Sequence, residues 1–146
     1  MSLTTDRPTH RSELRVRYAE TDRMGVAYYA NYLIWFEVAR TSFLREHGLR
    51  YRDLEARGHL LPVGEVHMRM IASARYDDLL AVDCWLSEVR SRKIVFGYEV
   101  FRIEDGGQEL LVRGTTALMA VDGDMKPSRL PEDLLAKFQA LTGSVA

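Results

Sequence analysis

The chain is poor in cysteine. Its 146 residues contain only Cys84, so no disulfide can form within one chain. It has no CxxC pair and none of the Cys/His spacings that bind structural zinc, so we expect no metal site. A Walker loop, a Gly-rich dinucleotide fingerprint and a G-x-S-x-G elbow are also missing. We therefore expect no cofactor, and a reducing compartment suits the single thiol.

Excess charge and long apolar runs are scarce as well. The formal net charge is -1 with both signs interspersed, which gives no broad basic face for a nucleic acid. The most apolar run, residues 27–39, is interrupted by Asn31 and Glu37 and is shorter than the ~20 residues that cross a bilayer. The first 13 residues lack the apolar core of a secretory signal. We expect a cytoplasmic protein that binds neither nucleic acid nor membrane.

What is present is a repeated strand pattern. Alternating apolar and polar residues predict a first strand over Glu13–Tyr18. Four more strands are predicted around the alternations at 66–70, 80–86, 94–100 and 110–118. Turn residues between them predict three short antiparallel connections. At this length we expect one domain, which we place at residues 11–141, with residues 1–10 as a mobile N-terminus.

A long helix is predicted over Tyr29–His47, with Gly48 at the position of a C-terminal cap. Between Tyr29 and Ala39 apolar residues occur all round the helical wheel, so we expect this helix to be buried on every side. A short helical or irregular stretch is expected at 51–57, and Pro131 opens a short C-terminal helix. This order favours an α+β fold, with a five-stranded antiparallel sheet wrapped around a long central helix.

One segment contains a dense motif. Residues 22–32 read DRMGVAYYANY and are followed by Phe36-Glu37 and Ala39-Arg40. The pattern closely resembles the signature of the 4-hydroxybenzoyl-CoA thioesterase-like branch of the hot-dog superfamily. Looser similarity at residues 74–78, 91–93 and 126–131 extends the resemblance over about residues 13 to 138. The resemblance implies a hot-dog fold and the hydrolysis of a small or medium acyl-CoA, with aromatic acyl groups among the candidates.

The resemblance also assigns roles in the chemistry. Thioester hydrolysis passes through a tetrahedral oxyanion, so a site needs a base or nucleophile and a donor aimed at the oxygen. By resemblance Asp22 supplies the carboxylate, which either attacks the carbonyl to form a mixed anhydride or activates water. The donor would be the backbone N–H of Tyr29 in the first turn of the helix. Gly25 would let the loop approach the substrate or adopt a backbone conformation barred to other residues.

Competing interpretations remain for the acidic residues. On composition alone Asp22 would be a turn or N-cap aspartate, and the surrounding motif reverses that preference. Glu20 is a weaker rival as the catalytic carboxylate. Glu37, charged within an apolar helix, is either a partnered buried acid at a subunit contact or an aid to the chemistry. Many bacterial members have histidine where Tyr29 stands, so a histidine-assisted step is not expected here.

A basic cluster is the candidate site for coenzyme A. Its pyrophosphate and 3′-phosphate call for arginine and lysine, and the densest basic segment is Arg90-Ser91-Arg92-Lys93. Taken without the resemblance, this segment is equally well a solvated hairpin turn. In the related thioesterase the same strand junction contacts phosphate, and Arg129 lies in a segment that does likewise. We therefore predict that Arg90, Arg92, Lys93 and Arg129 bind coenzyme A.

The resemblance further implies a homodimer or homotetramer, with two sheets paired edge to edge and the site formed between protomers. An acyl-carrier protein is a second candidate partner beside acyl-CoA. Two alternative functions stay open. One is a hot-dog hydratase or dehydratase, which usually needs a histidine in its motif. The other is a module that binds acyl-CoA or an acyl-carrier protein without catalysis.

Overall fold

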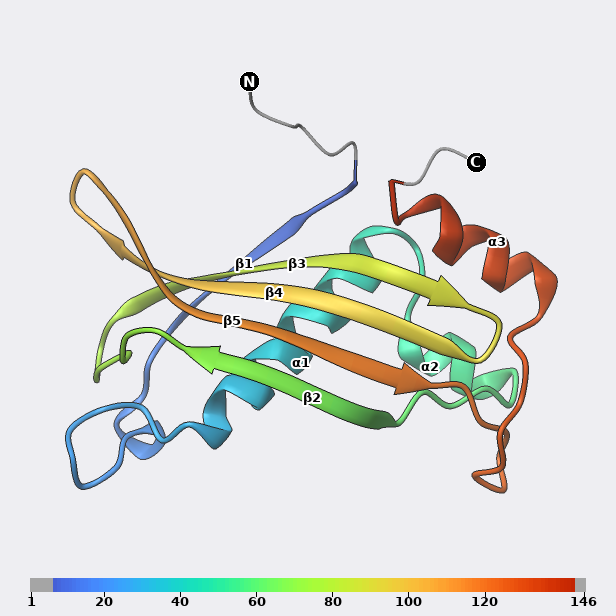
Figure 1. The fold of residues 1–146 in the computed structure, drawn as a ribbon, viewed down its shortest axis with the longest axis horizontal. Helices are drawn as coiled ribbons and strands as arrows, with labels where there is room; N and C mark the ends of the chain where they lie inside the picture. The colour runs from blue at the N-terminus through green and yellow to red at the C-terminus, as the bar shows by residue number, and fades with distance from the viewer. Residues whose placement is uncertain (1–6, 144–146) are drawn as a thin grey trace.

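Five antiparallel strands form one sheet, and a long helix crosses one of its faces (Figure 1). The computed structural model describes residues 7–143. The strand order is β1-β3-β4-β5-β2, so β1 and β2 are the two edges. The strands are β1 (His10–Arg15), β2 (Val63–Met70), β3 (Leu79–Arg90), β4 (Lys93–Glu104) and β5 (Gly107–Met119). The α+β prediction and the five antiparallel strands are confirmed.

The three central strands are joined by two-residue turns, which confirms two of the three short antiparallel connections predicted. The third prediction was wrong, because β2 and β3 are not neighbours in the sheet and β2 pairs with β5. Ser91 and Arg92 connect β3 to β4, and Asp105 and Gly106 connect β4 to β5. Gly106 has φ +84°, a left-handed conformation that favours glycine in tight hairpins. The links between other neighbours are longer, because α1 and α2 lie between β1 and β2 in the chain. Short turns therefore fix the register of the centre of the sheet.

The long helix α1 (Ala30–Glu46) begins and ends within one residue of the predicted bounds. Its inward side chains pack on the sheet. The Phe36 ring stacks on Tyr98 of β4, with centroids 4.1 Å apart and planes inclined by 9°. Gly114 of β5 makes this contact possible, since a Cβ there would lie 2.7 Å from the Phe36 ring. The core thus lies between α1 and one face of the sheet.

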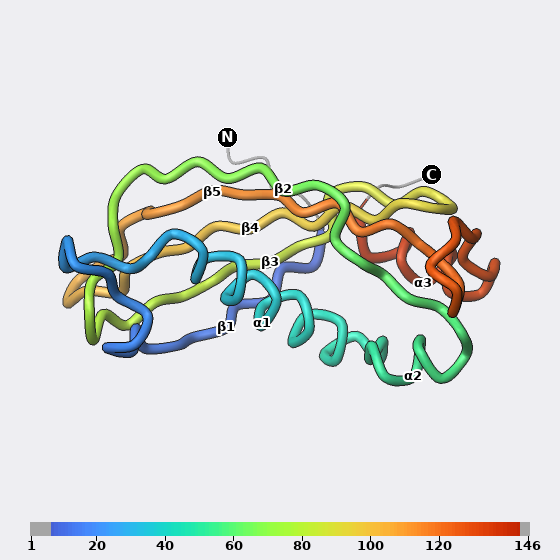
Figure 2. Tube along the Cα trace, turned by 90° about the horizontal axis from the view of Figure 1, so that it is seen from below, coloured from blue at the N-terminus to red at the C-terminus, as the bar shows by residue number. Residues whose placement is uncertain are grey.

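Helix α1 is not buried on every side, and that prediction was wrong. It covers one face of the sheet (Figure 2), while Leu33, Ile34 and Val38 remain 36%, 50% and 45% exposed. Composition around the helical wheel counts apolar residues but does not say what covers them. A single sheet can cover only one side of a helix, so an apolar strip is left open. Edge strand β2 is also exposed, with only Met68 half-buried.

The first strand lies earlier than predicted. Strand β1 starts at His10, which pairs with Cys84, and ends at Arg15 instead of Tyr18. Val16 still exchanges backbone hydrogen bonds with the 77–78 turn, and the chain then enters the short 3-10 helix η1 (Tyr18–Glu20). Of the N-terminal segment expected to be mobile, residues 1–6 lie outside the described residues.

Two smaller helices complete the fold. Helix α2 (Tyr51–Ala56) matches the predicted helical stretch, and α3 (Glu132–Ala140) begins directly after Pro131 as predicted. Leu134 and Phe138 of α3 are buried. Within residues 7–143, no helix is both long and apolar enough to span a membrane.

Candidate active site

The motif forms a small hydrogen-bonded loop ahead of α1. Asp22 N–H donates to the carbonyl of Val26 at 2.9 Å, and Gly25 N–H donates to the carbonyl of Asp22 at 3.0 Å. Gly25 has φ +81°, and a Cβ placed there would touch nothing within 4 Å. Of the two reasons considered for this glycine, the structure supports the backbone conformation.

The two oxygens of the Asp22 carboxylate fit different interpretations of the residue, one as a turn aspartate and the other as a catalytic group. Its Oδ1 accepts the backbone N–H of Met24 at 2.9 Å, which is the local turn contact expected of an ordinary loop aspartate. Its Oδ2 accepts no hydrogen bond from any residue between 7 and 143, and the side chain is only partly buried. One oxygen therefore fixes the orientation of the carboxylate while the other stays accessible.

Tyr29 stands at the N-terminus of α1 with helical φ and ψ of −56° and −29°. Its carbonyl accepts the N–H of Tyr32, but its own N–H donates to no acceptor among residues 7–143. Such first-turn amides carry the positive end of the helix dipole and are suited to an anion. The Tyr29 ring is 55% exposed and lies 5.0 Å from the Tyr28 ring, centroid to centroid.

Glu20 anchors this loop, a role that the sequence analysis did not foresee. Its carboxylate accepts the backbone N–H of Arg17 at 2.7 Å and the indole N–H of Trp35 at 3.0 Å. Its carbonyl accepts Tyr28 N–H and the Asn31 side-chain amide, both at 2.8 Å. Burial alone raises the pKa of Glu20, but the hydrogen bonds from Arg17 and Trp35 outweigh it and lower the pKa.

Since both oxygens of Glu20 are occupied and the residue is 5% exposed, it ties η1 to α1 and leaves the accessible carboxylate to Asp22. A signal was present in the sequence. Asn31 and Trp35 are one helical turn apart, so both can reach back to the same preceding residue.

Glu37 is exposed in the single chain, so burial at a subunit contact would need a second copy. It forms no ion pair within the described part of the chain and lies eight residues, or roughly 12 Å, along α1 from Tyr29. It borders a hollow of about 230 Å³ between α1 and β2, together with Arg40 and the exposed Leu33 and Ile34. In the single protomer it therefore faces the open apolar strip.

The predicted coenzyme A residues do gather at one place. Arg90, Arg92 and Lys93 surround the β3–β4 turn, and Leu130 N–H donates to the carbonyl of Ser91 at 2.8 Å. Arg129 is thereby held beside the turn. The side chains of Arg92 and Arg129 are exposed, while Arg90 Nε pairs with Glu88 at 2.6 Å.

This cluster and Asp22 lie at opposite ends of the sheet in one chain. The loop hydrogen-bonds to the segment before β3, through Ala27 N–H to the carbonyl of Ala74 at 2.8 Å. Strand β3 then runs eleven residue steps to Arg90, roughly 36 Å at 3.3 Å per residue. One protomer therefore does not place the two predicted halves of the site together.

Cys84 does not compete with Asp22 as a nucleophile. Cys84 is buried, and burial raises the pKa of its thiol, so it is not poised as a thiolate. Across residues 7–143 there is no group of three or more His, Cys, Asp or Glu side chains arranged to hold a metal ion.

Comparison with known proteins places the fold in a family. Residues 16–138 match the Thioesterase-like superfamily. The chain belongs to this superfamily. It is 36% identical over 112 residues to the putative acyl-CoA thioesterase YneP of Bacillus subtilis, covering 77% of this chain and 79% of the relative. It is 32% identical to the acyl-CoA thioester hydrolase YbgC of Escherichia coli O157:H7, covering 86% and 92%.

Solved structures of this thioesterase-like family agree. A hypothetical protein, TT1821, from Thermus thermophilus superposes with a TM-score of 0.83 at 36% identity, covering 92% of this chain and 98% of the other. A DHNA-CoA thioesterase from Staphylococcus aureus gives 0.83 at 35% identity, covering 94% and 97%. The hot-dog fold and the resemblance inferred from residues 22–40 are thus confirmed.

Proposed function

We propose that this protein is an acyl-CoA thioesterase whose chemistry is carried by the Asp22 carboxylate and the Tyr29 backbone N–H. The observation that supports the roles most directly is the pair of unused groups on one loop. Among residues 7–143, no group donates to the second carboxylate oxygen of Asp22, and the Tyr29 N–H at the helix N-terminus has no acceptor. Membership of the superfamily supports a thioester as the substrate.

The two groups divide the work of hydrolysis. The Tyr29 N–H binds the carbonyl oxygen of the thioester and stabilises the negative charge that develops on it. Asp22 either removes a proton from the attacking water or attacks the carbonyl carbon itself, forming an anhydride that water then cleaves. In both routes the C–S bond breaks, the thiolate of coenzyme A leaves and takes a proton, and a carboxylic acid remains. Both routes need Asp22 ionised.

A homodimer would complete the site. The Val63 end of β2 pairs with Leu118 and, one strand further, lies level with Ile94 beside the basic cluster. The Met70 end lies toward the Asp22 loop. A second copy pairing antiparallel along β2 would therefore bring its own basic cluster to the Asp22 end of this chain. The same pairing would cover the open side of α1 and protect an exposed sheet edge.

In that arrangement the partner's basic cluster would take the phosphates of coenzyme A. Its turn would lie about two strand spacings, roughly 10 Å, from the paired edge, which leaves room for the extended arm that carries the thioester. Glu37, exposed in one chain, would then lie at the subunit contact. A tetramer would add a second contact between such dimers. A cytoplasmic location fits the unpaired Cys84.

Two other functions make different predictions. A hydratase or dehydratase would leave the thioester intact, and no histidine lies in the 20–29 loop to assist it. A binding module would retain coenzyme A without turnover. An acyl-carrier protein would serve as an alternative carrier of the same thioester.

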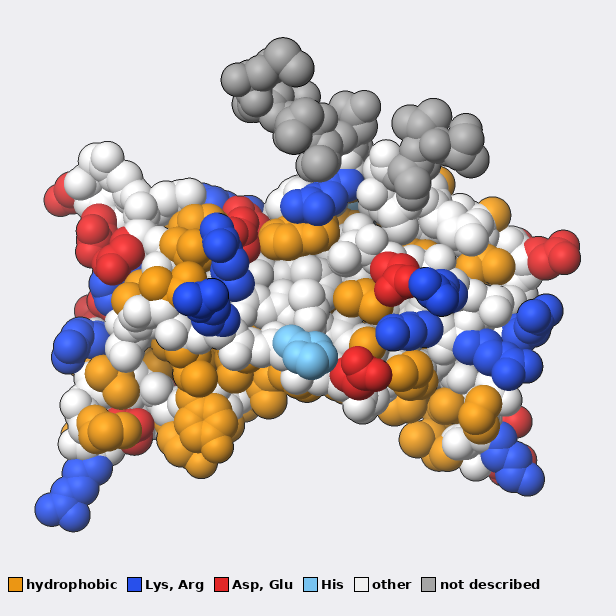
Figure 3. Space-filling view, in the orientation of Figure 1, with side chains coloured by type: hydrophobic (Ala, Val, Ile, Leu, Met, Phe, Trp, Pro, Cys, Tyr) orange, Lys and Arg blue, Asp and Glu red, His pale blue; other side chains and the backbone are white. Residues whose placement is uncertain are grey.

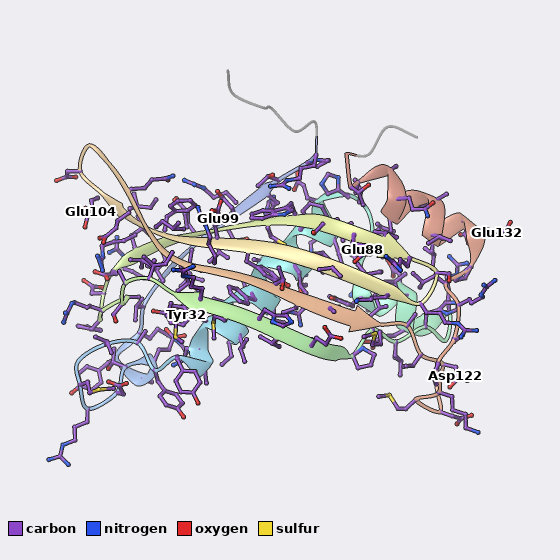
Figure 4. All side chains as sticks on the ribbon, in the orientation of Figure 1. Tyr32, Glu88, Glu99, Glu104, Asp122 and Glu132 are labelled. Carbon is purple, nitrogen blue, oxygen red and sulfur yellow. The ribbon has the colours of Figure 1, made fainter. Side chains whose placement is uncertain are left out.

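The deciding experiment is release of free thiol from a panel of acyl-CoA thioesters by wild type and by Asp22→Asn. Asp122→Asn is the matched control, because Asp122 Oδ1 also caps backbone amides in a turn. Figure 4 labels Asp122 near the right-hand end of the molecule and Tyr32 of α1 to the left of its centre. We expect Asp22→Asn to lower kcat by about 10²–10⁴-fold and Asp122→Asn to leave it unchanged. Equal losses in both variants, or full activity in Asp22→Asn, would refute the assignment.

A further inference from the structure

The sheet face opposite α1 contains a hollow that the thioester chemistry does not use. Its volume is about 530 Å³, within the usual range for small-molecule sites. Figure 3 shows this face, with basic side chains gathered beside an uncoloured central depression. The lining includes the following side chains: Arg7, Arg69, Trp85, Glu99, Arg113 and Thr115.

One row of the sheet places the Trp85 indole beside the hollow. Trp85, Gly97, Thr115 and His67 are register partners on four adjacent strands. Gly97 has no side chain, and the Trp85 indole lies against its backbone, so a Cβ there would collide with the ring. The indole N–H of Trp85 donates to no acceptor within residues 7–143. A free donor therefore lies at the floor of the hollow.

The next row of the sheet has a charge imbalance. Asp83 is bound by Arg11 at 2.7 Å, and Glu99 is bound by Arg113 at 3.1 Å. Arg69 is the direct register partner of Arg113, yet it has no carboxylate within ion-pair distance among the described residues. Like charges directly opposite each other on neighbouring strands destabilise a sheet. Folding alone does not explain this arginine pair.

A third arginine adds positive charge beside the same hollow. The Arg7 guanidinium lies 4.4 Å from the centroid of the Trp85 ring, and its Nε is buried without a hydrogen-bond partner among residues 7–143. Three guanidinium groups therefore border the hollow. The carboxylate in its lining is that of Glu99, labelled in Figure 4, which is already paired with Arg113. Guanidinium forks match phosphate oxygens in geometry and charge.

We propose that this hollow is a binding site for a phosphorylated small molecule, held by Arg69, Arg113 and Arg7, with the Trp85 indole N–H as a further donor. Phosphate is the favoured group because it offers several oxygens and more than one charge to converging arginines. The site lies across the sheet from the Asp22 loop, so its ligand is not the thioester being hydrolysed. The inference does not depend on the proposed thioesterase activity.

Tryptophan fluorescence locates the ligand, because the chain has only two tryptophans, Trp85 and Trp35, and Trp35 is a buried residue of α1. We would titrate the full-length protein with pyrophosphate, ADP, adenosine and succinate, and repeat each titration by calorimetry. We expect pyrophosphate and ADP to bind and to quench the fluorescence, while adenosine and succinate do not. The quench should vanish in Trp85→Phe. Succinate binding as tightly as pyrophosphate would refute the phosphate assignment.

Arg69→Ala is the decisive variant, since the side chain is exposed and its removal leaves the fold intact. We expect this variant to bind pyrophosphate more weakly, with a Kd about tenfold higher than that of the wild type. Arg52→Ala, an exposed arginine on α2, removes the same charge elsewhere and should leave Kd unchanged. Equal effects of both variants, or no uptake by wild type, would overturn the proposal. It would also fail if Arg69→Ala kept the Kd but dissociated the oligomer, because Arg69 would then serve the subunit contact.

Discussion

Trp35 donates its indole N–H to the carboxylate of Glu20 at 3.0 Å, and this bond joins the core of α1 to the loop that precedes it. The remaining Glu20 oxygen is held by the backbone of Arg17. The position of the Asp22 loop relative to the start of α1 therefore depends on a buried carboxylate whose two oxygens both accept hydrogen bonds.

Replacing Glu20 by Gln should weaken the hydrogen bonds that link the Asp22 loop to α1. The variant keeps the shape but loses charge-assisted hydrogen bonds, each worth roughly 1.5–3 kcal/mol when buried. We expect a lower free energy of unfolding in urea and a reduced kcat, with Trp35 fluorescence reporting the change. Wild-type stability and kcat in Glu20→Gln would show that the bond to Trp35 is not structural.

Acid should act through the same residue. The folded-state pKa of Glu20 lies below its unfolded value, so the folded protein binds fewer protons there. Its stabilising contribution is full above the unfolded pKa, about 4.3, and is lost as the pH falls through the folded pKa. We expect the stability difference between wild type and Glu20→Gln to be constant near pH 7 and to shrink below about pH 4. A difference that grows on acidification would contradict this sign.

Gly25→Ala tests whether the backbone conformation of Gly25, and not the space around it, matters for activity. The residue has φ +81° and open space around it, so only backbone strain of about 1 kcal/mol opposes alanine. We expect the loop to shift and kcat to fall, with little change in thermal stability. Gly123→Ala is the control, because Gly123 also lies in open space but does not have a positive φ. Similar activity in the two variants would argue against a conformational role for Gly25.

The basic cluster is tested by comparing substrates. Arg92→Ala should raise KM for acyl-CoA but not for the matching acyl-pantetheine, which lacks the nucleotide phosphates. The effect should shrink as salt is added, because exposed charges are screened. Arg52→Ala serves again as the charge-matched control. An equal KM increase for both substrates would place Arg92 away from the phosphates.

The open strip of α1 predicts self-association. Ile34 is half exposed, so Ile34→Asp should cost a monomer little but should disrupt a dimer that covers it. We expect sedimentation to show dissociation and loss of activity in Ile34→Asp, and an intact oligomer in Ile34→Leu. An unchanged sedimentation profile in Ile34→Asp would remove this strip from the interface.

Sequence patterns predicted most of the sheet because the period of two is strong in its central strands, where Leu80, Val82 and Cys84 all point into the core. They placed β1 too late because Val16 and Tyr18 continue the alternation after the strand has ended. The apolar wheel of α1 was misread for a different reason. Periodicity records which residues avoid water, but not whether their cover comes from the same chain.

The sequence likewise predicted some residues of the candidate site and missed the role of another. Asp22, Gly25 and Tyr29 lie within one short segment, so a local motif was enough to group them. By resemblance Arg129 was assigned to a segment that contacts phosphate, and the structure places it beside the β3–β4 turn through a backbone hydrogen bond from Leu130 to Ser91. The anchoring role of Glu20 was missed because it depends on the tertiary contact with Trp35. The spacing of Asn31 and Trp35 shows only that both side chains can reach one preceding residue, and it does not say which residue that is.

The length of β3 also has a genetic consequence. If Asp22 of one subunit works with the basic cluster of the other, an inactive Asp22→Asn protein and a weak Arg92→Ala protein carry defects in different halves of the site. A mixed dimer then contains one site with both defects and one site with neither. Co-expression of the Asp22→Asn and Arg92→Ala genes should restore activity that neither variant shows alone. Two copies of a gene that carries both substitutions should never complement each other.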